Sequence, residues 1–334
     1  MSNDRMNQDT MQALLFDRPG AAEDVLHLGC APVPAPGAGE VRIRVAARVI
    51  QPADRLFIAG RYRVTPRFPQ VAGFDGAGQV DAVGVGVDAA WLGRRVAFRN
   101  VGAWADFAVA PVRRIHAVPD DIGMRQACQF TLNPLTAWGL LATTQVSSGQ
   151  RLLVTAGHAS VSRWIAALGA ARGIDITLVA RDDSGWTAWS AGVGDTRSAA
   201  TLAQLLQPLA AQRGFDAVID PIGGPATLDL IDACAPGAAL VSYGVLDDRP
   251  FELRASQLLY RNLRWFGFGI DRYLDALRES ELAGAREAVW QLMREQPALT
   301  AVAASHPLRD HGAALRDSDR LVREGKVLFT QERA

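Results

Sequence analysis

Residues 150–183 contain a pattern suited to holding an anionic ligand. An apolar run at 152–154 is followed by the turn TAGHAS at 155–160, and then by apolar residues at helical spacing from Val161 to Leu168. A second apolar run covers 174–179. Strand, turn, helix and strand in this order form a βαβ unit, in which the helix N-terminus offers unpaired N–H groups and the positive end of its dipole. The pattern predicts a dinucleotide-binding unit with a pyrophosphate over the turn.

This turn departs from the glycine-rich fingerprint of such units, which places glycine where the backbone meets phosphate. Only Gly157 remains, and Ala159, Ser160 and Ser162 occupy the neighbouring positions. The serine side chains could narrow the phosphate groove, donate hydrogen bonds to a phosphate, or cap the helix. On spacing alone, a βαβ unit that packs without any ligand is an equally good interpretation.

Composition limits the classes of function. The 334 residues are enough for about two domains, and 35 basic residues balance 35 acidic ones, so net charge does not favour binding to nucleic acid or an anionic membrane. No apolar run approaches the roughly 18 residues of a membrane span. Residues 1–10 are polar and are predicted to form a disordered tail, not a signal peptide. Cys30, Cys128 and Cys234 are too dispersed for a disulfide framework or zinc knuckle. A cytoplasmic location is expected.

The rest of the chain has two kinds of sequence pattern, which indicate two kinds of secondary structure. Short β segments with Gly and Pro turns from 11 to about 118 predict a small β barrel or sandwich. Residues 122–142 are predicted to be helical, with an interruption at Asn133-Pro134. Strands expected at 152–155, 174–179, 215–220, 238–243 and 263–268 alternate with helices, which predicts a parallel sheet covered on both faces. Helices follow until a closing strand at 327–330.

Several motifs, in this order along the chain, carry a resemblance to a known family. They are PVPAPGAGEV at 32–41, PAD at 52–54 with GRY at 60–62, FPQVAGFDGAG at 68–78, VGVGV at 83–87, GAWA at 102–105, NPLTAW at 133–138, DPIGG at 220–224 and GKV at 325–327. Together they resemble the medium-chain dehydrogenase/reductase superfamily, in its zinc-free quinone oxidoreductase and 2-enoyl thioester reductase branch. The resemblance extends over about residues 11–331.

The resemblance implies an α/β protein of two domains. A GroES-like β domain, residues 11–125 with 268–334, would carry the substrate. A Rossmann domain with a doubly wound parallel sheet, residues 126–267, would bind the cofactor. In this family the strand near 263–268 pairs across a dimer, so a homodimer is expected.

No zinc site is expected, because the positions that carry zinc ligands in the alcohol dehydrogenase branch are occupied by Gln51, Phe74-Asp75 and Leu132. These residues lack the thiolates and imidazoles that zinc prefers.

Hydride transfer to an activated double bond or a quinone then becomes the expected reaction, with a hydrogen-bond donor stabilising the developing enolate. Tyr62 matches the proton donor of 2-enoyl thioester reductases, and a phenol is protonated at neutral pH. Alternatively, Tyr62 packs under the loop before Phe68.

The resemblance and the turn together predict the cofactor site. Its candidate residues are Asn133, Thr136, Gly157, His158, Ser160, Val161, Ser162, Arg181, Tyr243, Phe266 and Phe268. For Asn133, a break in a helix is an alternative interpretation, as strand packing is for Phe266 and Phe268. Arg181 follows the second strand and favours NADPH, because arginine binds a ribose 2′-phosphate. Asp182 and Asp183 favour NADH, and no basic residue is evident at 185–193, where a helix is expected.

Three functions therefore remain open. The first is a zinc-independent, NADPH-dependent reductase of an enoyl thioester or enone, and the second is a quinone reductase. The third is a non-catalytic member of the family that binds cofactor poorly and acts through partner proteins, in keeping with the missing glycines.

Overall fold

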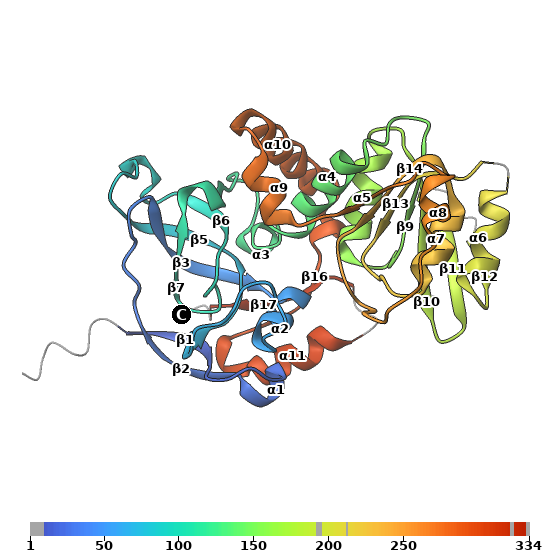
Figure 1. The fold of residues 1–334 in the computed structure, drawn as a ribbon. Coiled ribbons are helices and arrows are strands. Elements are labelled where there is room, and N and C mark those ends of the chain that lie inside the picture. Colours follow the sequence, from blue (N-terminus) through green and yellow to red (C-terminus); the bar gives the residue numbers. More distant parts are fainter. Residues whose placement is uncertain (1–9, 192–195, 212, 321–323, 332–334) are drawn as a thin grey trace, which may run out of the picture. The chain divides into compact units, whose positions relative to one another are not determined.

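The computed structural model describes residues 10–191, 196–211, 213–320 and 324–331 (Figure 1). The chain divides into two compact units, residues 1–132 with 293–334, and residues 133–292. The predicted tail lies outside the described residues except for Thr10, which begins strand β1. The predicted domain boundaries at 125/126 and 267/268 differ from the limits of this division, which lie at 132/133 and 292/293. The second limit lies later than predicted because the two helices that follow the last parallel strand belong largely to the second unit.

The first unit is built mainly from antiparallel strands. Its smaller sheet has the order β2 (His27–Pro32), β1 (Thr10–Phe16) and β4 (Gln70–Val71). Its larger sheet has the order β16 (Val302–His306), β17 (Lys326–Thr330), β3 (Glu40–Val49), β5 (Asp75–Val83), β6 (Arg95–Arg99) and β8 (Ile115–Ala117), and β7 (Phe107–Pro111) also pairs with β3. The short helices are α1 (Ala22–Val25), α2 (Pro52–Ile58), α3 (Met124–Ala127), α11 (His311–Asp319) and the 3₁₀ turns η1 (Ala89–Trp91), η2 (Val112–Arg114), η3 (Pro297–Thr300) and η4 (Leu308–Asp310).

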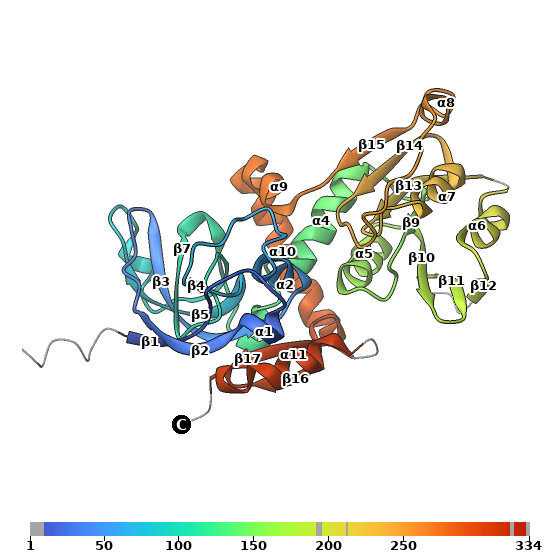
Figure 2. The ribbon, with the colours of Figure 1, turned by 60° about the horizontal axis from the view of Figure 1, so that its bottom comes forward.

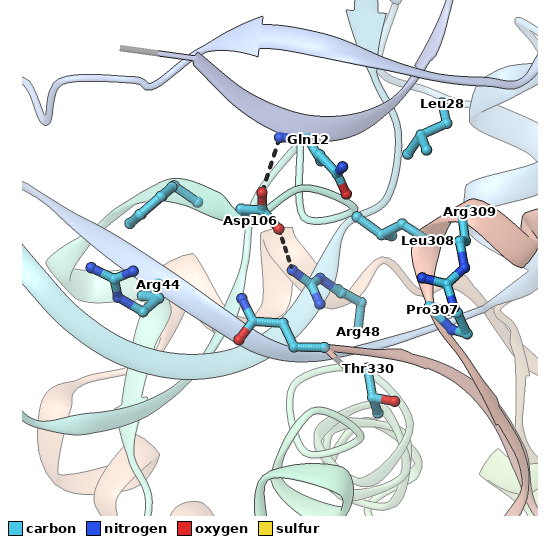
Figure 3. A pocket seen from close by; sticks show the side chains of 11 residues that line it. Gln12, Leu28, Arg44, Arg48, Asp106, Pro307, Leu308, Arg309 and Thr330 are labelled. Carbon is cyan, nitrogen blue, oxygen red and sulfur yellow. Dashed lines mark hydrogen bonds and ion pairs between the residues drawn. The ribbon is translucent and has the colours of Figure 1, made fainter. Parts of the chain in front are cut away.

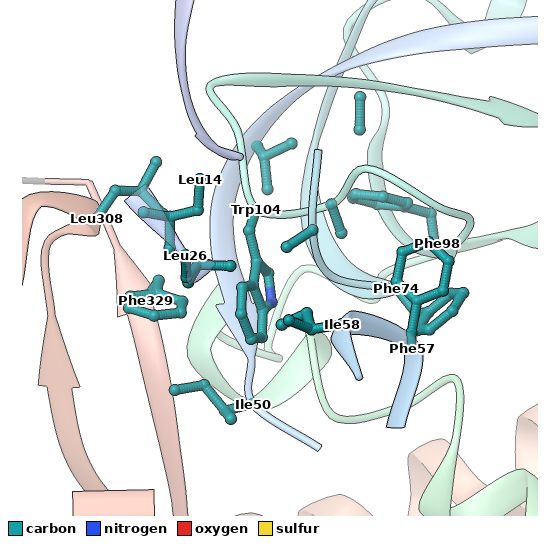
Figure 4. Packing of buried hydrophobic residues seen from close by; sticks show 14 of the residues in the cluster. Leu14, Leu26, Ile50, Phe57, Ile58, Phe74, Phe98, Trp104, Leu308 and Phe329 are labelled. Atoms are coloured by element: carbon teal, nitrogen blue, oxygen red, sulfur yellow. The ribbon is translucent and has the colours of Figure 1, made fainter. Parts of the chain in front are cut away.

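The core of the first unit is organised around Trp104. This side chain is fully buried, with the Phe329 ring 5.1 Å from its own on one side and the Phe57–Phe74 pair on the other (Figure 4). Gly73 has a φ of +85°, and a Cβ at this position would lie 2.1 Å from Cδ1 of Trp104. Only glycine fits there, because the indole occupies the space that a side chain would need.

In the described residues of the second unit, seven strands form one sheet. Their order is β12 (Thr196–Ala199), β11 (Gly185–Ser190), β10 (Asp175–Asp182), β9 (Arg151–Val154), β13 (Phe215–Asp220), β14 (Cys234–Ser242) and β15 (Arg264–Gly267). The five strands from β10 to β15 are parallel, whereas β11 and β12 are antiparallel. The helices are α4 (Asn133–Thr144), α5 (Ser160–Ala170), α6 (Leu202–Ala210), α7 (Ala226–Ala233), α8 (Ala255–Leu259), α9 (Ile270–Ala276) and α10 (Glu279–Glu295).

This sheet is doubly wound. The chain leaves the central strand β9 through α5 to reach β10 on one side, and later returns to β13 on the other side. Helices α4 and α5 pack together on one face, and α6 and α7 on the other (Figures 1 and 2). The predicted fold class, a β domain with a Rossmann-like parallel sheet, is confirmed. The carboxyl end of β9, where the strand order reverses, is the position at which such sheets bind ligands.

The segment after β10 is not the predicted helix. Residues 185–190 form strand β11, which returns along β10 and pairs Trp186 with Arg181 and Trp189 with Leu178. Trp186 and Ala188 are buried while their neighbours are partly exposed, which is the alternation of a strand. Tryptophan and threonine favour strands, and the turn is fixed by Ser184, whose N–H donates to Oδ1 of Asp182 at 2.8 Å. Among the described residues that follow β11, the next helix is α6, which begins at Leu202.

Candidate functional site

The turn between β9 and α5 has the expected strand–turn–helix geometry. Helix α5 begins at Ser160, and its N-cap, Ala159, has no side chain that could accept hydrogen bonds from the first turn. The N-terminal N–H groups of this helix therefore lack a side-chain acceptor from the cap and can serve an anion. Thr155, at the start of the turn, is hydrogen-bonded to strand β13. Its N–H donates to the Ile219 carbonyl at 3.1 Å, and its hydroxyl donates to Asp220.

The outer side of the turn is covered by an aromatic pair. A Cβ on Gly157 would lie 2.6 Å from Cη2 of Trp189, so the indole lies directly against this glycine. The exposed His158 ring stacks on the same indole, with the ring centroids 4.7 Å apart and an angle of 22°. The single remaining glycine of the turn thus makes room for Trp189. Sequence reasoning missed Trp189, because the spacing of the two tryptophans at 186 and 189 does not distinguish a strand from a helix.

The structure separates the roles of the two serines. Ser160 is partly exposed and accepts a hydrogen bond from Nδ2 of Asn133 at 3.2 Å, which joins the starts of α4 and α5. Ser162 is fully buried and donates to the Ala156 carbonyl at 2.9 Å. The interpretation that Ser162 narrows the phosphate groove is therefore wrong, because its side chain points back into the turn. Val161 is partly buried at the start of the helix.

Two polar side chains close to this region have atoms without partners. Oγ1 of Thr136 is buried and has no hydrogen-bond partner among the described residues, and the same holds for Nε of Arg163 in the first turn of α5. Buried polar atoms are normally satisfied. The Thr136 hydroxyl could therefore exchange a hydrogen bond with a bound molecule or water, and Nε of Arg163 could donate one.

Arg181 lies near the end of β10, as predicted, and its side chain is exposed. Its guanidinium lies 5.9 Å from the centre of the Trp186 ring. The adjacent Asp182 carboxylate is already engaged, because it accepts hydrogen bonds from the hydroxyl and the N–H of Ser184 at 2.5 and 2.8 Å. These two bonds lower the pKa of Asp182, and the nearby His158 lowers it slightly further.

The aromatic candidates differ in their surroundings. Tyr243 follows β14, and its N–H donates to the Asp220 carbonyl at 3.0 Å. Burial raises the pKa of Tyr243 above its usual range, while a hydrogen bond with Ser162 opposes this rise. Phe268 packs against Gly139 of α4, since a Cβ there would lie 2.7 Å from its ring. Phe266 is exposed on the edge strand β15.

The first unit contains a connected polar chain around Tyr62. The Tyr62 hydroxyl accepts a hydrogen bond from Nη2 of Arg99 at 3.4 Å. Nη1 of Arg99 donates to Asp75, and the other oxygen of Asp75 accepts from the Thr131 hydroxyl at 2.6 Å. Arg99 and Asp75 are both buried and lie opposite each other on β6 and β5. A buried ion pair thus holds the guanidinium against the phenol oxygen.

Next to this chain lies a second buried carboxyl, Asp54, near the start of α2. It accepts hydrogen bonds from the N–H groups of Gln51 at 2.7 Å and Phe74 at 3.0 Å. Burial, together with the negative charge of Asp75, raises the pKa of Asp54 to about 8. The group is consequently mostly protonated at neutral pH, and sequence reasoning did not single it out.

The positions that bear zinc ligands in alcohol dehydrogenases are used differently here. Gln51 accepts a hydrogen bond from Nζ of Lys326 at 2.8 Å, and Asp75 is paired with Arg99. Within the described parts of the chain, no group of three or more His, Cys, Asp or Glu side chains could hold a metal ion. The donor set present does not fit a zinc ion, which prefers sulfur and nitrogen ligands.

Comparisons with known proteins found a family match within the first unit and relatives that align with nearly the whole chain. The alcohol dehydrogenase GroES-like domain family matches residues 37–120. The mitochondrial enoyl-[acyl-carrier-protein] reductase of Bos taurus is 27% identical over 96% of this chain and 88% of its own length. Both findings agree with the resemblance to the medium-chain dehydrogenase/reductase superfamily, and the match over residues 37–120 lies in the first unit.

Solved structures share the fold of this chain over almost its full length. A candidate NADPH:quinone reductase from Bacillus thuringiensis superimposes with a TM-score of 0.83, at 24% identity, over 97% of this chain and 99% of its own. A mycobacterial protein solved in complex with NADPH has a TM-score of 0.80, at 23% identity, over 96% and 100% of the two chains. In the part of this chain that the structure describes, no helix combines the length and apolar character needed to cross a bilayer.

Proposed function

We propose that the protein is a zinc-independent, NADPH-dependent oxidoreductase that reduces an activated double bond, in an enoyl thioester or enone, or a quinone. The hydrogen bond between Arg99 and the Tyr62 hydroxyl carries this proposal, because it places a cation beside a phenolic proton donor. The names of the relatives, enoyl reductases and NADPH:quinone reductases, support the same class of reaction. The first unit would carry the substrate and the second unit the cofactor.

On the cofactor side, the N-terminus of α5 would bind the pyrophosphate, and Arg181 would bind the ribose 2′-phosphate through its planar guanidinium. Asn133, hydrogen-bonded to Ser160, would fix the start of α4 next to the phosphates. Thr136 and Tyr243 would lie along the cofactor, whereas Phe268 serves packing against α4. When bound, NADPH supplies the hydride.

On the substrate side, Tyr62 would act as the proton donor. Hydride addition to the β carbon of an enoyl group moves the electron pair of the C=C bond onto the α carbon and the carbonyl oxygen, which forms an enolate. The enolate then takes a proton at the α carbon. Tyr62 would give that proton, and its phenolate would be stabilised by Arg99 until solvent returns a proton. Asp75 and Thr131 would hold Arg99 in place, so both act as positioning residues.

Substrate panels with a Tyr62→Phe variant distinguish the two reductase functions. Enolate protonation is required for a crotonyl-type thioester but not for a naphthoquinone, whose reduced oxygens take protons from water. We expect kcat to fall about 10²-fold or more with the thioester and to change little with the quinone. Equal rates of the variant and the wild type with both substrates would exclude a role for Tyr62.

A non-catalytic function is the second candidate, and the Trp189–His158 pair over the phosphate turn favours it. Titration with NADPH and NADH, followed by nicotinamide fluorescence, decides between the two. The reductase predicts micromolar NADPH affinity, weaker NADH affinity, and a loss of this preference in Arg181→Ser but not in Arg197→Ser, a control on the exposed strand β12. Absence of binding to either cofactor would favour the non-catalytic function.

We also propose a homodimer and a cytoplasmic location. Strand β15 forms the edge of the parallel sheet, and its Trp265 and Phe266 are 37% and 39% exposed. An exposed edge strand with aromatic side chains can pair with a second copy. Sedimentation of the purified protein tests this assembly, and a monomer at micromolar concentration would contradict it.

A further inference from the structure

The first unit contains a cavity that the proposed reaction does not use. Its volume is about 450 Å³, within the range of small-molecule sites. Three arginines line it, Arg44, Arg48 and Arg309, whereas Asp106 is the one carboxylate among its lining residues in the described part of the chain. In Figure 3, Arg44 and Arg309 lie on opposite sides of the cavity and Arg48 lies between them. The cavity therefore has an excess of positive charge.

Arg48 is the most unusual of the three, because it is buried. Only 1% of its side chain is exposed. Nε and Nη2 both donate to the Ala105 carbonyl, at 3.2 and 2.5 Å, and Nη2 lies 4.0 Å from Oδ1 of Asp106. Nη1 has no hydrogen-bond partner among the described residues. A buried charged donor without an acceptor is costly, so an acceptor is expected to fill this place in the working protein.

The negative charge near Arg48 only partly compensates for the burial of its positive charge. Burial lowers its pKa to about 10, and the attraction of Asp106 compensates only in part. Asp106 is itself engaged, since its other oxygen accepts the N–H of Gln12 at 2.9 Å. The guanidinium is still protonated at neutral pH. An anion in the cavity would supply the charge that Asp106 does not.

The two exposed arginines are placed to complete an anion site. The Arg44 guanidinium lies 4.8 Å from the centre of the Phe107 ring, an arrangement that restricts its plane. Arg309 approaches from the opposite wall (Figure 3). Guanidinium groups bind phosphate oxygens in pairs of parallel hydrogen bonds. Leu28, Phe107 and Leu308 add an apolar wall to the same cavity.

We propose that this cavity binds a phosphoryl group, either as free phosphate or as the head of an organic phosphate monoester. Arg44 and Arg48 against the single carboxylate of Asp106 leave an excess positive charge beside the Arg309 guanidinium, which suits an anionic phosphoryl group. Every lining residue belongs to the first unit, so the site does not depend on the proposed cofactor loop or reductase activity.

Isothermal titration at low ionic strength, in a buffer free of phosphate and sulfate, tests this site. The probes are inorganic phosphate, glycerol 3-phosphate and, as a carboxylate control, succinate. The variants are Arg44→Gln and Arg309→Gln, both at exposed positions that should not disturb folding. Arg113→Gln, at another exposed arginine of the same unit, is the matched control. Arg48→Met is added if its unfolding midpoint stays close to that of the wild type.

We expect one equivalent of a phosphate probe to bind, with affinity reduced about tenfold by Arg44→Gln and by Arg309→Gln and unchanged by Arg113→Gln. Tighter binding of glycerol 3-phosphate than of inorganic phosphate would identify a monoester as the ligand, and equal affinity would identify free phosphate. The proposal is overturned if neither phosphate binds, if succinate binds equally well, or if the Arg44 and Arg309 variants bind phosphate as the wild type does.

Discussion

Arg99 donates a hydrogen bond to the Tyr62 hydroxyl at 3.4 Å while its other terminal nitrogen is paired with Asp75. The buried ion pair fixes the guanidinium, so the phenol oxygen faces a cation that cannot move away. Tyr62 thereby differs from a tyrosine that only packs. Its ring does contact Phe74, with centroids 5.3 Å apart, but its hydroxyl belongs to a polar chain that ends at Thr131.

Arg99→Lys should lower kcat for an enoyl thioester about 10- to 100-fold with little change in KM, because lysine keeps the charge but cannot hold Asp75 and Tyr62 together. Steady-state kinetics in wild-type and Tyr62→Phe backgrounds measure this. In the Tyr62→Phe background, Arg99→Lys should have no further effect on kcat. Arg63→Lys is the control, since the Arg63 guanidinium lies 5.5 Å from the centre of the Tyr62 ring. Additive losses would show that Arg99 does not act through Tyr62.

Trp189 should limit access to the phosphate turn. Trp189→Ala removes the indole from Gly157 and His158 and is expected to tighten NADPH binding several-fold, as measured by fluorescence titration. Gly157→Ala should cost about 1–3 kcal/mol of stability in the wild type, because the new methyl group meets the indole. In the Trp189→Ala background this cost should largely disappear. A cost that persists in the double variant would mean that the indole is not what excludes a side chain.

Because of Asp54, the free energy of unfolding should fall as pH rises. Its pKa is about 8 in the folded protein and about 4 in an unfolded chain, so the folded state holds the extra proton between these values. The contribution is fully present below pH 4, is lost progressively as pH rises to about 8, and amounts to a few kcal/mol. Urea unfolding of wild type and Asp54→Asn at pH 5, 7 and 9 measures it. An equal pH dependence in the two proteins would assign the effect to another group.

Gly73 and Gly86 offer a matched pair for testing the core. Both have positive φ angles, +85° and +79°, but only Gly73 faces Trp104, whereas a Cβ on Gly86 would meet no atom within 4 Å. Alanine at Gly86 should cost about 1 kcal/mol from backbone strain alone. Alanine at Gly73 should cost several kcal/mol more or prevent folding, because Trp104 has no room to move. Chemical unfolding midpoints compare the two, and similar values would indicate that the indole can shift.

The regular elements near the cofactor turn were predictable because their apolar periodicity is strong. Strand β9, helix α5 and the apolar part of β10 follow directly from the runs at 152–154, 161–168 and 174–179. Strand β11 was missed, because a short segment with two tryptophans and no long apolar run is ambiguous between helix and strand. Its pairing with β10 depends on the turn at Asp182.

The polar chain around Tyr62 could not be derived from the sequence. Asp75 and Arg99 become neighbours only through the register of β5 against β6. Arg48 illustrates the same limit. Residues 40–49 alternate apolar side chains with arginines, which suggests that the arginines face solvent, and Arg44 is indeed exposed. Arg48 is buried because the segment before β7 lies against its side chain, with Nε and Nη2 donating to the Ala105 carbonyl. Such placement depends on contacts between distant segments.

The pairing of β17 with β3 has a consequence for synthesis of the chain. Val49 of β3 lies opposite Leu328, so the larger sheet of the first unit lacks an inner strand until residues 326–330 have been translated. The second unit, which is continuous in sequence from 133 to 292, has all its strands earlier. On the ribosome the later-encoded unit should therefore become protected from protease before the earlier one. Until then, β3 keeps an open hydrogen-bonding edge that is exposed to wrong partners.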